Sequence, residues 1–380
     1  MMKKIIWVLA VSLATACHQA KKEDTTTSIA TVGVDSLHFS TQLDSQRVAL
    51  YEIVNDNMKV QLTNFGARIV SLVVKDKQDS FVDVVLGYDT AEEFIQNSRN
   101  FYGAIVGRYG NRIGKASFVL NNTTYNLEKN DNNNTLHGGF NGVYNKVWKV
   151  DQASSTSITF SYYSPDGEAG YPGNVLMKVT YSLNDKGGLE ITYDAETDKE
   201  TVLNLTNHAY FNLNGAGDST ILDHHLWIDA DKITEVDAEL IPTGKGIDVT
   251  NTPFDFRVSK EIGKDIGQDH PQIAFGKGYD HNFELNKKEN FAEVAKLYAP
   301  RTGIEMTILT TEPGLQFYSG NFMSENDPKG KKGQTYPYRS ALCLETQHFP
   351  DAPNHPNFAS TVLKPGEKYA SKTEYRFAVK

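Results

Sequence analysis

The sequence predicts an all-β protein, folded as one large antiparallel β-sandwich. Short segments of alternating polarity recur along the chain between turn signals of Gly, Asn and Asp. Aromatic residues make up 11% of the chain, with 19 Tyr and 19 Phe, and aromatic side chains pack well on pleated sheets. From about Phe39 onward there is no linker or break in composition. A chain of 380 residues is long enough for one large β domain, which we place at 38–380.

The individual elements follow from local patterns. Two-residue alternation and β-prone runs predict strands at 59–63, 67–74, 157–163, 175–183, 188–193, 304–309, 315–318 and 341–347. Asn121 and Asn122 lie between two such runs and predict a hairpin turn. Helical periodicity is scarce, and one short helix is expected at 90–95.

The first residues have the layout of a secretory signal. Two lysines precede an apolar run at 5–14, and a small residue precedes Cys17. The run is too short to span a bilayer, which takes about 20 residues. It resembles a bacterial lipoprotein signal at 1–16, cut before Cys17 and lipidated there, although Ala14 stands where such signals favour Leu. The alternative is an ordinary signal peptide with an incidental cysteine. A polar tether would follow at 17–37, and we expect an exported, lipid-anchored protein on the periplasmic side of the cell envelope.

Charge and cysteine usage exclude several classes of partner and site. The net charge is −9 and no extended basic tract occurs, so neither nucleic acid nor an anionic membrane surface is expected as a partner. Cys343 is the only other cysteine, which rules out a disulfide framework and a cysteine-based zinc site. We expect Cys343 to be a small buried residue.

Several familiar catalytic motifs are absent. The Gly-rich stretch 107–114 lacks the spacing and the Lys-Ser/Thr ending of a phosphate-binding P-loop, and no G-x-S-x-G elbow occurs. Asp229 and Asp231 hint at calcium, but the glycine and final glutamate of an EF-hand loop are missing. We therefore expect no metal for the chemistry. The sequence does not decide whether the protein binds a structural Ca²⁺ ion.

The stretch 205–213, LTNHAYFNL, reads as a strand with one apolar and one polar face. Alternation places Thr206, His208, Tyr210 and Asn212 on the polar face. Such a strand either lines a wet cleft or simply faces bulk water, and this pattern alone does not distinguish the two.

Four further polar residues stand in aromatic or Gly-rich settings. His137 precedes two glycines, where backbone can approach a ligand closely, and Asp280 lies between two aromatics. Gln316 shares a strand face with Tyr318, and Glu345 lies among small apolar neighbours that would desolvate it and raise its pKa. Three of these residues have a structural alternative. His137 is then a turn residue, Asp280 accepts hydrogen bonds from its own backbone, and Glu345 forms a structural ion pair. Together they suggest a sugar site with an acid–base pair.

Seven segments, in this order, resemble the aldose 1-epimerase (galactose mutarotase) family. They are NFGA at 64–67, GRYGNRI at 107–113, TLHGG at 135–139, NHAYFNL at 207–213, YDH at 279–281, GLQFYSGNF at 314–322 and LETQHFPDAPN at 344–354. They cover nearly the whole chain after the tether, and no position that the family uses for chemistry departs from its pattern.

The resemblance implies a single β-sandwich of the supersandwich type, acting as a monomer on free aldoses such as galactose and glucose. It implies interconversion of α and β anomers by ring opening and reclosure, with Glu345 as the base and His208 as the acid. By the same resemblance His137 is a second histidine near the sugar ring. Asn111, Arg112, Asp280 and Gln316 would bind hydroxyl groups. A histidine pKa near 6.5 suits proton exchange near neutral pH, and no cofactor is needed.

Other readings of the same residues remain. A hexose-6-phosphate 1-epimerase would need a cluster of Arg and Lys, and only Arg108 and Arg112 lie near a matched segment. A non-catalytic carbohydrate-binding protein would keep the aromatics without the acid–base pair. A glycosidase would need two carboxylates flanking the bond, for which Asp280 and Glu345 are candidates.

Overall fold

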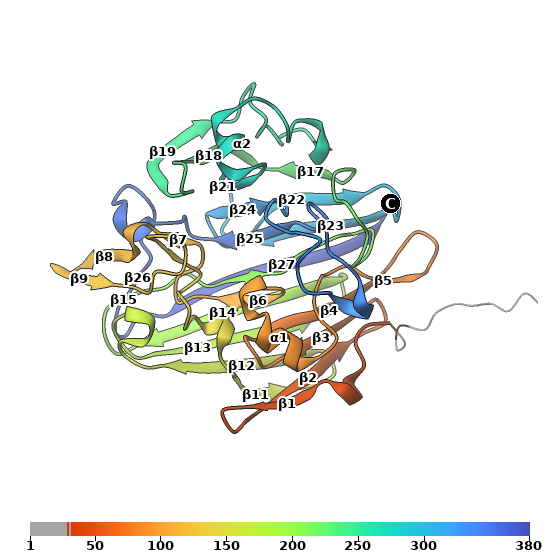
Figure 1. Ribbon diagram of the computed structural model, residues 1–380, viewed down its shortest axis with the longest axis horizontal. Coiled ribbons are helices and arrows are strands. Elements are labelled where there is room, and N and C mark those ends of the chain that lie inside the picture. Colours follow the sequence, from red (N-terminus) through yellow and green to blue (C-terminus); the bar gives the residue numbers. More distant parts are fainter. Residues whose placement is uncertain (1–28, 30–31) are drawn as a thin grey trace, which may run out of the picture.

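The computed structural model describes residue 29 and residues 32–380, and in this part the regular secondary structure is mainly β-strand (Figure 1). The expected signal segment 1–16 and Cys17 lie outside the described residues. Val34 falls within the expected tether, yet it is only 6% exposed, and its backbone N–H donates to Gln61 Oε1. The folded region therefore begins a few residues before position 38.

The largest element is an antiparallel sheet of nine strands. In spatial order these are β11 (Lys149–Ala153), β12 (Ser157–Ser164), β13 (Val175–Leu183), β14 (Gly188–Thr197), β27 (Tyr369–Val379), β23 (Ile304–Thr310), β22 (Ala292–Ala299), β17 (His225–Ile228) and β20 (Lys260–Glu261). The last strand of the chain thus lies in the middle of this sheet and joins its earlier strands to its later ones.

Two five-stranded sheets accompany the large one. The first contains β1 (Ser40–Leu43), β2 (Gln46–Val54), β3 (Met58–Thr63), β4 (Arg68–Lys75) and β5 (Phe81–Asp83). The second has the order β19 (Pro242–Asp248), β18 (Ala230–Val236), β21 (Asp280–Leu285), β24 (Gly314–Tyr318) and β25 (Cys343–Gln347).

Four two-stranded ladders complete the strands. They pair β6 (Ala104–Val106) with β16 (Thr206–His208), β7 (Arg112–Ile113) with β10 (Thr135–Leu136), β8 (Ser117–Leu120) with β9 (Thr123–Asn126), and β15 (Thr201–Val202) with β26 (Val362–Leu363). The β8–β9 hairpin turns at Asn121 and Asn122, as the sequence predicts.

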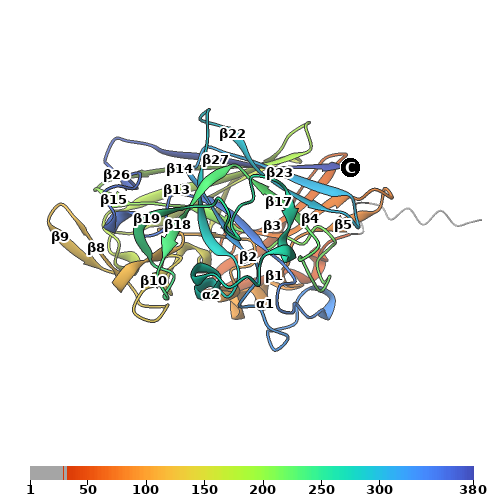
Figure 2. The ribbon, with the colours of Figure 1, turned by 90° about the horizontal axis from the view of Figure 1, so that it is seen from above.

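Two short α-helices, α1 (Ala91–Gln96) and α2 (Pro271–Gly276), lie on the side of the molecule away from β13, β14 and β27 (Figure 2). Helix α1 confirms the helix expected at 90–95. Thr90 caps it by accepting from the Glu93 N–H, while the Glu93 carboxylate accepts from the Thr90 N–H. Among the described residues, no helix has the length and apolar character needed to cross a bilayer.

The main hydrophobic core lies between the large sheet and the two smaller ones. Its buried members include Val179 and Met306 from the large sheet, Val60 from the first small sheet, and Phe283 and Phe317 from the second. These strands alternate inward apolar residues with outward polar ones, which is the pattern that predicts a sandwich. The all-β sandwich is therefore confirmed.

The stretch 205–213 departs from the expected nine-residue strand. Only Thr206–His208 forms a strand, because its partner β6 offers just three residues. The chain then crosses between the small sheets, where Phe211 bridges both Val85 and Leu342. The expected division of faces still holds at its centre, since His208 and Tyr210 face a cavity while Phe211 packs in the core.

Candidate active site

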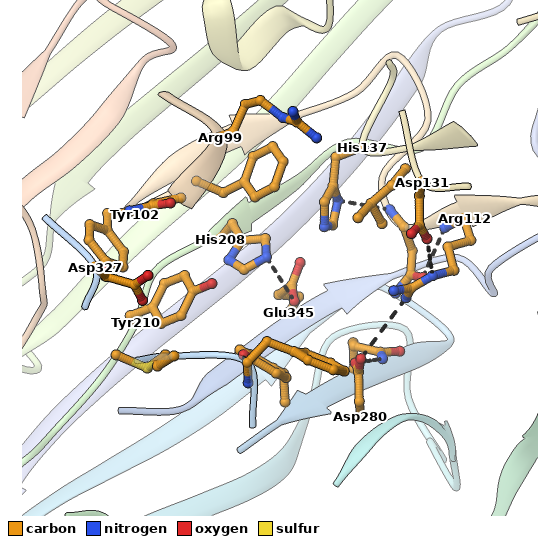
Figure 3. Close-up of a pocket in the computed structure, with 18 residues that line it drawn as sticks. Arg99, Tyr102, Arg112, Asp131, His137, His208, Tyr210, Asp280, Asp327 and Glu345 are labelled. Atoms are coloured by element: carbon orange, nitrogen blue, oxygen red, sulfur yellow. Dashed lines mark hydrogen bonds and ion pairs between the residues drawn. The ribbon is translucent and has the colours of Figure 1, made fainter. Parts of the chain in front are cut away.

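A cavity of about 360 Å³ opens beside the second small sheet and gathers most of the predicted polar residues (Figure 3). This volume is in the range of small-molecule sites and accommodates one hexose. The lining residues are Arg99, Asn100, Phe101, Tyr102, Asn111, Arg112, Asp131, Leu136, His137, His208, Tyr210, Asp280, Gln316, Tyr318, Phe322, Met323, Asp327 and Glu345. All seven residues that the family resemblance assigned to catalysis or sugar binding are among them.

The floor of the cavity is one face of the β21–β24–β25 sheet. Register places Gln316 opposite Glu345, and Tyr318 opposite both Asp280 and Cys343. Because side chains on a strand alternate, these residues share the cavity face, while Phe317 points into the core. The period-2 reading of 314–320 and 341–347 is therefore correct.

Glu345 is a buried carboxyl group with incomplete hydrogen bonding. The residue is 2% exposed, and its Oε2 atom has no hydrogen-bond partner among the described residues. Burial, and then the negative charge of Asp280, raise the Glu345 pKa well above its usual value, while Arg112 acts in the opposite direction. Desolvation raises the pKa of a carboxyl because it disfavours the charged form. The sequence-based expectation of a desolvated carboxylate agrees with this environment.

His208 extends from the end of β16 and is held between two aromatic rings. Its imidazole stacks on Phe101 at 5.6 Å and on Tyr210 at 5.1 Å, with interplanar angles of 26° and 21°. Burial lowers the His208 pKa to about 3, partly offset by a hydrogen bond to its own backbone. The ordinary histidine pKa near 6.5 expected from sequence thus does not apply, because the alternating pattern could not show how fully the ring is enclosed.

The two groups meet at the centre of the cavity. His208 Nε2 lies 3.7 Å from Glu345 Oε1 (Figure 3), although the residues are far apart in sequence. Burial favours the uncharged form of both groups, because it raises the carboxyl pKa and lowers the imidazole pKa. A neutral carboxyl and a neutral imidazole share one proton, which Glu345 carries. Moving that proton to His208 gives the ion pair without changing the proton count. Titration of such a pair belongs to both groups together.

His137 sits on a tight turn joined to Asn111. The His137 N–H donates to the Asn111 carbonyl at 3.0 Å, and the Asn111 N–H donates back to His137 Nδ1 at 3.1 Å. Gly138 follows with φ +87, and a Cβ there would lie 1.9 Å from the Gly107 carbonyl oxygen. The glycine is thus needed for close approach to the chain's own backbone.

The tautomer of His137 limits what the cluster can bind. His137, His208 and Glu345 offer ligand-type atoms within 4.8 Å of one another. Because Nδ1 of His137 accepts the Asn111 N–H, its neutral ring carries hydrogen on Nε2 and has no lone pair there for a metal ion. The arrangement favours hydrogen bonding and proton transfer over metal ligation. The neutral form dominates, since burial lowers the His137 pKa well below its usual value.

A polar network occupies the far end of the cavity from Tyr102 (Figure 3). Gln316 Nε2 donates to Asp280 Oδ1 at 2.7 Å, and Arg112 Nη1 lies 4.0 Å from Asp280 Oδ2. Arg112 Nε also donates to Asp131 at 2.9 Å. Burial raises the Asp280 pKa, while Arg112 and Gln316 oppose the shift. Charged and amide groups fixed in this way suit the recognition of sugar hydroxyls.

Several cavity residues escaped the sequence reasoning. Asp131, Phe101 and Asp327 lie in loops without regular periodicity, so their spacing carried no signal. Conversely, Arg108 of the Gly-rich stretch is structural: its buried guanidinium donates to Ser164 Oγ and to the carbonyl oxygens of 164, 165, 172 and 173. Cys343 is buried as expected, and its Sγ also lies 3.5 Å from His208 Nδ1.

Comparison with known proteins agrees with this geometry. The family model described as aldose 1-epimerase matches residues 49–376. The chain belongs to the aldose 1-epimerase family. The family predicted from the seven sequence segments is therefore confirmed.

The similarity extends over nearly the full length of individual relatives. A galactose mutarotase of Bos taurus is 42% identical over 337 residues, which cover 89% of this chain and 96% of that protein. An aldose 1-epimerase of Escherichia coli is 37% identical over 328 residues, covering 85% and 93%. The crystal structure of a GalM/aldose epimerase homologue from C. elegans superposes with a TM-score of 0.81 at 34% identity, covering 87% and 99%.

Proposed function

We propose that this protein is an aldose 1-epimerase, an isomerase that interconverts the α and β anomers of free aldohexoses such as galactose and glucose. The observation that carries this function is the His208–Glu345 pair. The two groups lie 3.7 Å apart inside a cavity of hexose size, and their pKa values are shifted in opposite directions. Groups whose environments separate their pKa values in this way are typical acid–base partners.

The reaction needs one base and one acid at the same acetal centre. In ring opening, ionised Glu345 takes the proton from the C1 hydroxyl while His208 Nε2 gives its proton to the ring oxygen. The C1–O5 bond breaks and the C1=O1 double bond forms. After rotation about C1–C2, Glu345 returns its proton to O1, His208 takes the proton from O5, and the ring closes on the other face. Each positioned group contributes roughly 10²–10⁴-fold to the rate.

The pair passes through two protonation states in this cycle. A neutral carboxyl and a neutral imidazole are the state that follows ring opening and precedes ring closure. The ion-paired state, which begins ring opening, differs by transfer of one proton over the 3.7 Å between Glu345 and His208. Because both states hold the same number of protons, the pair can cycle without exchanging protons with solvent. The proposed reaction therefore needs no cofactor.

The charges around the cavity argue against a phosphorylated substrate. Four carboxyl groups line the cavity, from Asp131, Asp280, Asp327 and Glu345. The two lining arginines are Arg99 and Arg112, of which Arg112 already pairs with acidic side chains. A dianionic phosphate would meet an excess of negative charge, so a neutral aldose fits better. A purely carbohydrate-binding protein would have no use for two buried titratable groups so close together.

Polarimetry tests the proposal directly. Freshly dissolved α-galactose and α-glucose should relax to their anomeric equilibrium faster with the protein. The protein should accelerate the equilibration of hexose 6-phosphate much less. Absence of acceleration on every free aldose would refute the function. The His225→Asn variant is a matched control, because His225 forms a similar contact at 3.8 Å with Glu261 on the surface. It should retain wild-type activity.

We further propose that the protein is exported, lipid-anchored at Cys17 on the periplasmic side of the cell envelope, and active as a monomer. The support is the signal-like pattern at 1–17 and the family resemblance. The Cys17→Ala variant should move from the membrane fraction to the soluble fraction with unchanged mutarotation. Equal membrane association of both proteins would contradict lipidation, and sedimentation analysis of the protein lacking residues 1–17 would test the monomer.

A further inference from the structure

The buried thiol of Cys343 contacts the side of His208 that faces away from the reaction. Cys343 Sγ lies 3.5 Å from His208 Nδ1, while Nε2 is the nitrogen 3.7 Å from Glu345. Cys343 and Glu345 are two residues apart on β25 and therefore project from the same face of the sheet. Residues of one strand, β25, therefore lie next to both ring nitrogens of His208. Stacking between Phe101 and Tyr210 keeps the His208 ring from rotating away from these contacts.

We propose that Cys343 is a positioning residue whose sulfur accepts the Nδ1–H of His208, so that Nε2 alone exchanges a proton with the sugar. This inference rests on the proposed mutarotase reaction. It assigns a function to a residue that the sequence marks only as small and buried.

The direction of the hydrogen bond follows from the reaction cycle. After His208 gives its Nε2 proton to the ring oxygen, Nε2 must keep a free lone pair to take the proton back in ring closure. The neutral ring must then carry its hydrogen on Nδ1. If the thiol instead donated to Nδ1, the hydrogen of the neutral ring would sit on Nε2 and ring closure would lack its base. The hydrogen bond between His208 and its own backbone favours the charged ring, so its backbone partner is also an acceptor.

The chemical nature of the acceptor matters as much as its place. A carboxylate at Nδ1 would stabilise the imidazolium and weaken it as an acid. A thiol is neutral and only a weak acceptor, and burial raises the Cys343 pKa well above its usual value, which keeps it neutral. Cys343 therefore selects the tautomer of His208 while leaving its imidazolium a strong acid. That suits a ring oxygen, which is a weak base.

Replacement of Cys343 separates this function from simple packing. Cys343→Ala removes the sulfur acceptor and leaves only the backbone one. The value of kcat should then fall on the order of 10-fold with KM unchanged, comparable to the loss of a hydrogen-bond partner on the second nitrogen of a metal-bound histidine. Cys343→Ser keeps an acceptor of similar size and should restore most of kcat. Because a hydroxyl accepts more strongly than a thiol, the acid limb of the kcat/KM profile should move to higher pH. Cys343→Val, which fills the space without an acceptor, should behave like Cys343→Ala.

Nitrogen-15 NMR of the histidine rings gives a second readout that needs no substrate. Wild type and Cys343→Ser should show His208 mainly as the Nδ1–H tautomer, and Cys343→Ala should show a larger Nε2–H fraction. An Nε2–H tautomer in wild type, or equal kcat in wild type and Cys343→Ala, would overturn the inference. A loss of kcat in Cys343→Ser as large as in Cys343→Ala would do the same. These outcomes leave wild-type mutarotation intact, whereas failure of the proposed function would appear as an inactive wild type.

Discussion

The Asp280 carboxylate should set the alkaline limit of activity. Mutarotation requires one proton on the His208–Glu345 pair, so the rate falls at high pH when the pair loses it. The charge of Asp280 raises the Glu345 pKa, second only to burial. In the Asp280→Asn variant this repulsion disappears, the Glu345 pKa falls, and the alkaline limb of kcat/KM should move to lower pH.

The same substitution should also weaken sugar binding, and the size of this effect follows from the free energy of one hydrogen bond to a charged group. Asp280 is 9% exposed and is fixed by Gln316 at 2.7 Å, so its free lone pairs are available to a sugar hydroxyl. A hydrogen bond to a charged group contributes about 1.5–3 kcal/mol, which corresponds to a fall in kcat/KM of about 10- to 150-fold. The fall should appear mainly in KM if the contact is equally strong in the ground and transition states.

The assay is the pH dependence of kcat/KM for α-galactose, followed by polarimetry for wild type, Asp280→Asn and Asp327→Asn. Asp327 lines the same cavity, but its charge is not among the causes of the Glu345 shift. Its variant should therefore keep the wild-type alkaline limb. The reasoning is refuted if the limb of Asp280→Asn stays in place or moves to higher pH, or if Asp327→Asn moves it equally.

Three further predictions concern the scaffold. Arg108→Met leaves several buried acceptors unpaired and should lower the free energy of unfolding by about 3–5 kcal/mol in urea titrations. Gly138→Ala should cost at least about 2 kcal/mol more than Gly167→Ala, since both have positive φ but only the first meets backbone, at 1.9 Å. Burial lowers the His281 pKa to about 3, so the unfolded chain binds its proton first and stability falls as pH drops below about 6.5. His281→Gln should make the loss between pH 7 and 5 about 2 kcal/mol smaller.

Each scaffold prediction has a contradicting result. Arg47→Met, at an exposed site, should change stability by less than about 0.5 kcal/mol, and an equal loss in both arginine variants would deny the structural role of Arg108. Equal stability of the two alanine variants would show that backbone contact at Gly138 is unimportant. An unchanged or steeper pH dependence in His281→Gln would show that this ring is protonated in the folded protein.

The sequence predicted the parts of the site that follow strict local geometry. Side chains along a strand alternate between its two faces, so the shared face of Gln316 and Tyr318 could be predicted before any coordinates. The family pattern then joined His208 to Glu345, which no local rule connects. The fold class followed in the same way from many short alternating segments.

What the sequence could not give depends on contacts between distant segments. The strand at 205–213 shortened to Thr206–His208 because the length of a strand depends on its partner, here β6. The pKa of His208 depends on the rings of Phe101 and Tyr210 and on burial, none of which is visible in spacing. The sequence places Arg108 in a matched segment but does not show that its guanidinium donates to backbone carbonyls of distant loops.

The central claim is that His208 and Glu345 act as one unit on one sugar. The most direct test measures the initial mutarotation rate of α-galactose with Glu345→Gln, His208→Asn and the double variant. The mutarotation rate of each single variant should be roughly 10²–10⁴-fold lower than that of the wild type. The double variant should be as active as the less active single variant, because either substitution alone disables the shared proton transfer. Substantial activity in either single variant, or losses that multiply in the double variant, would contradict the account.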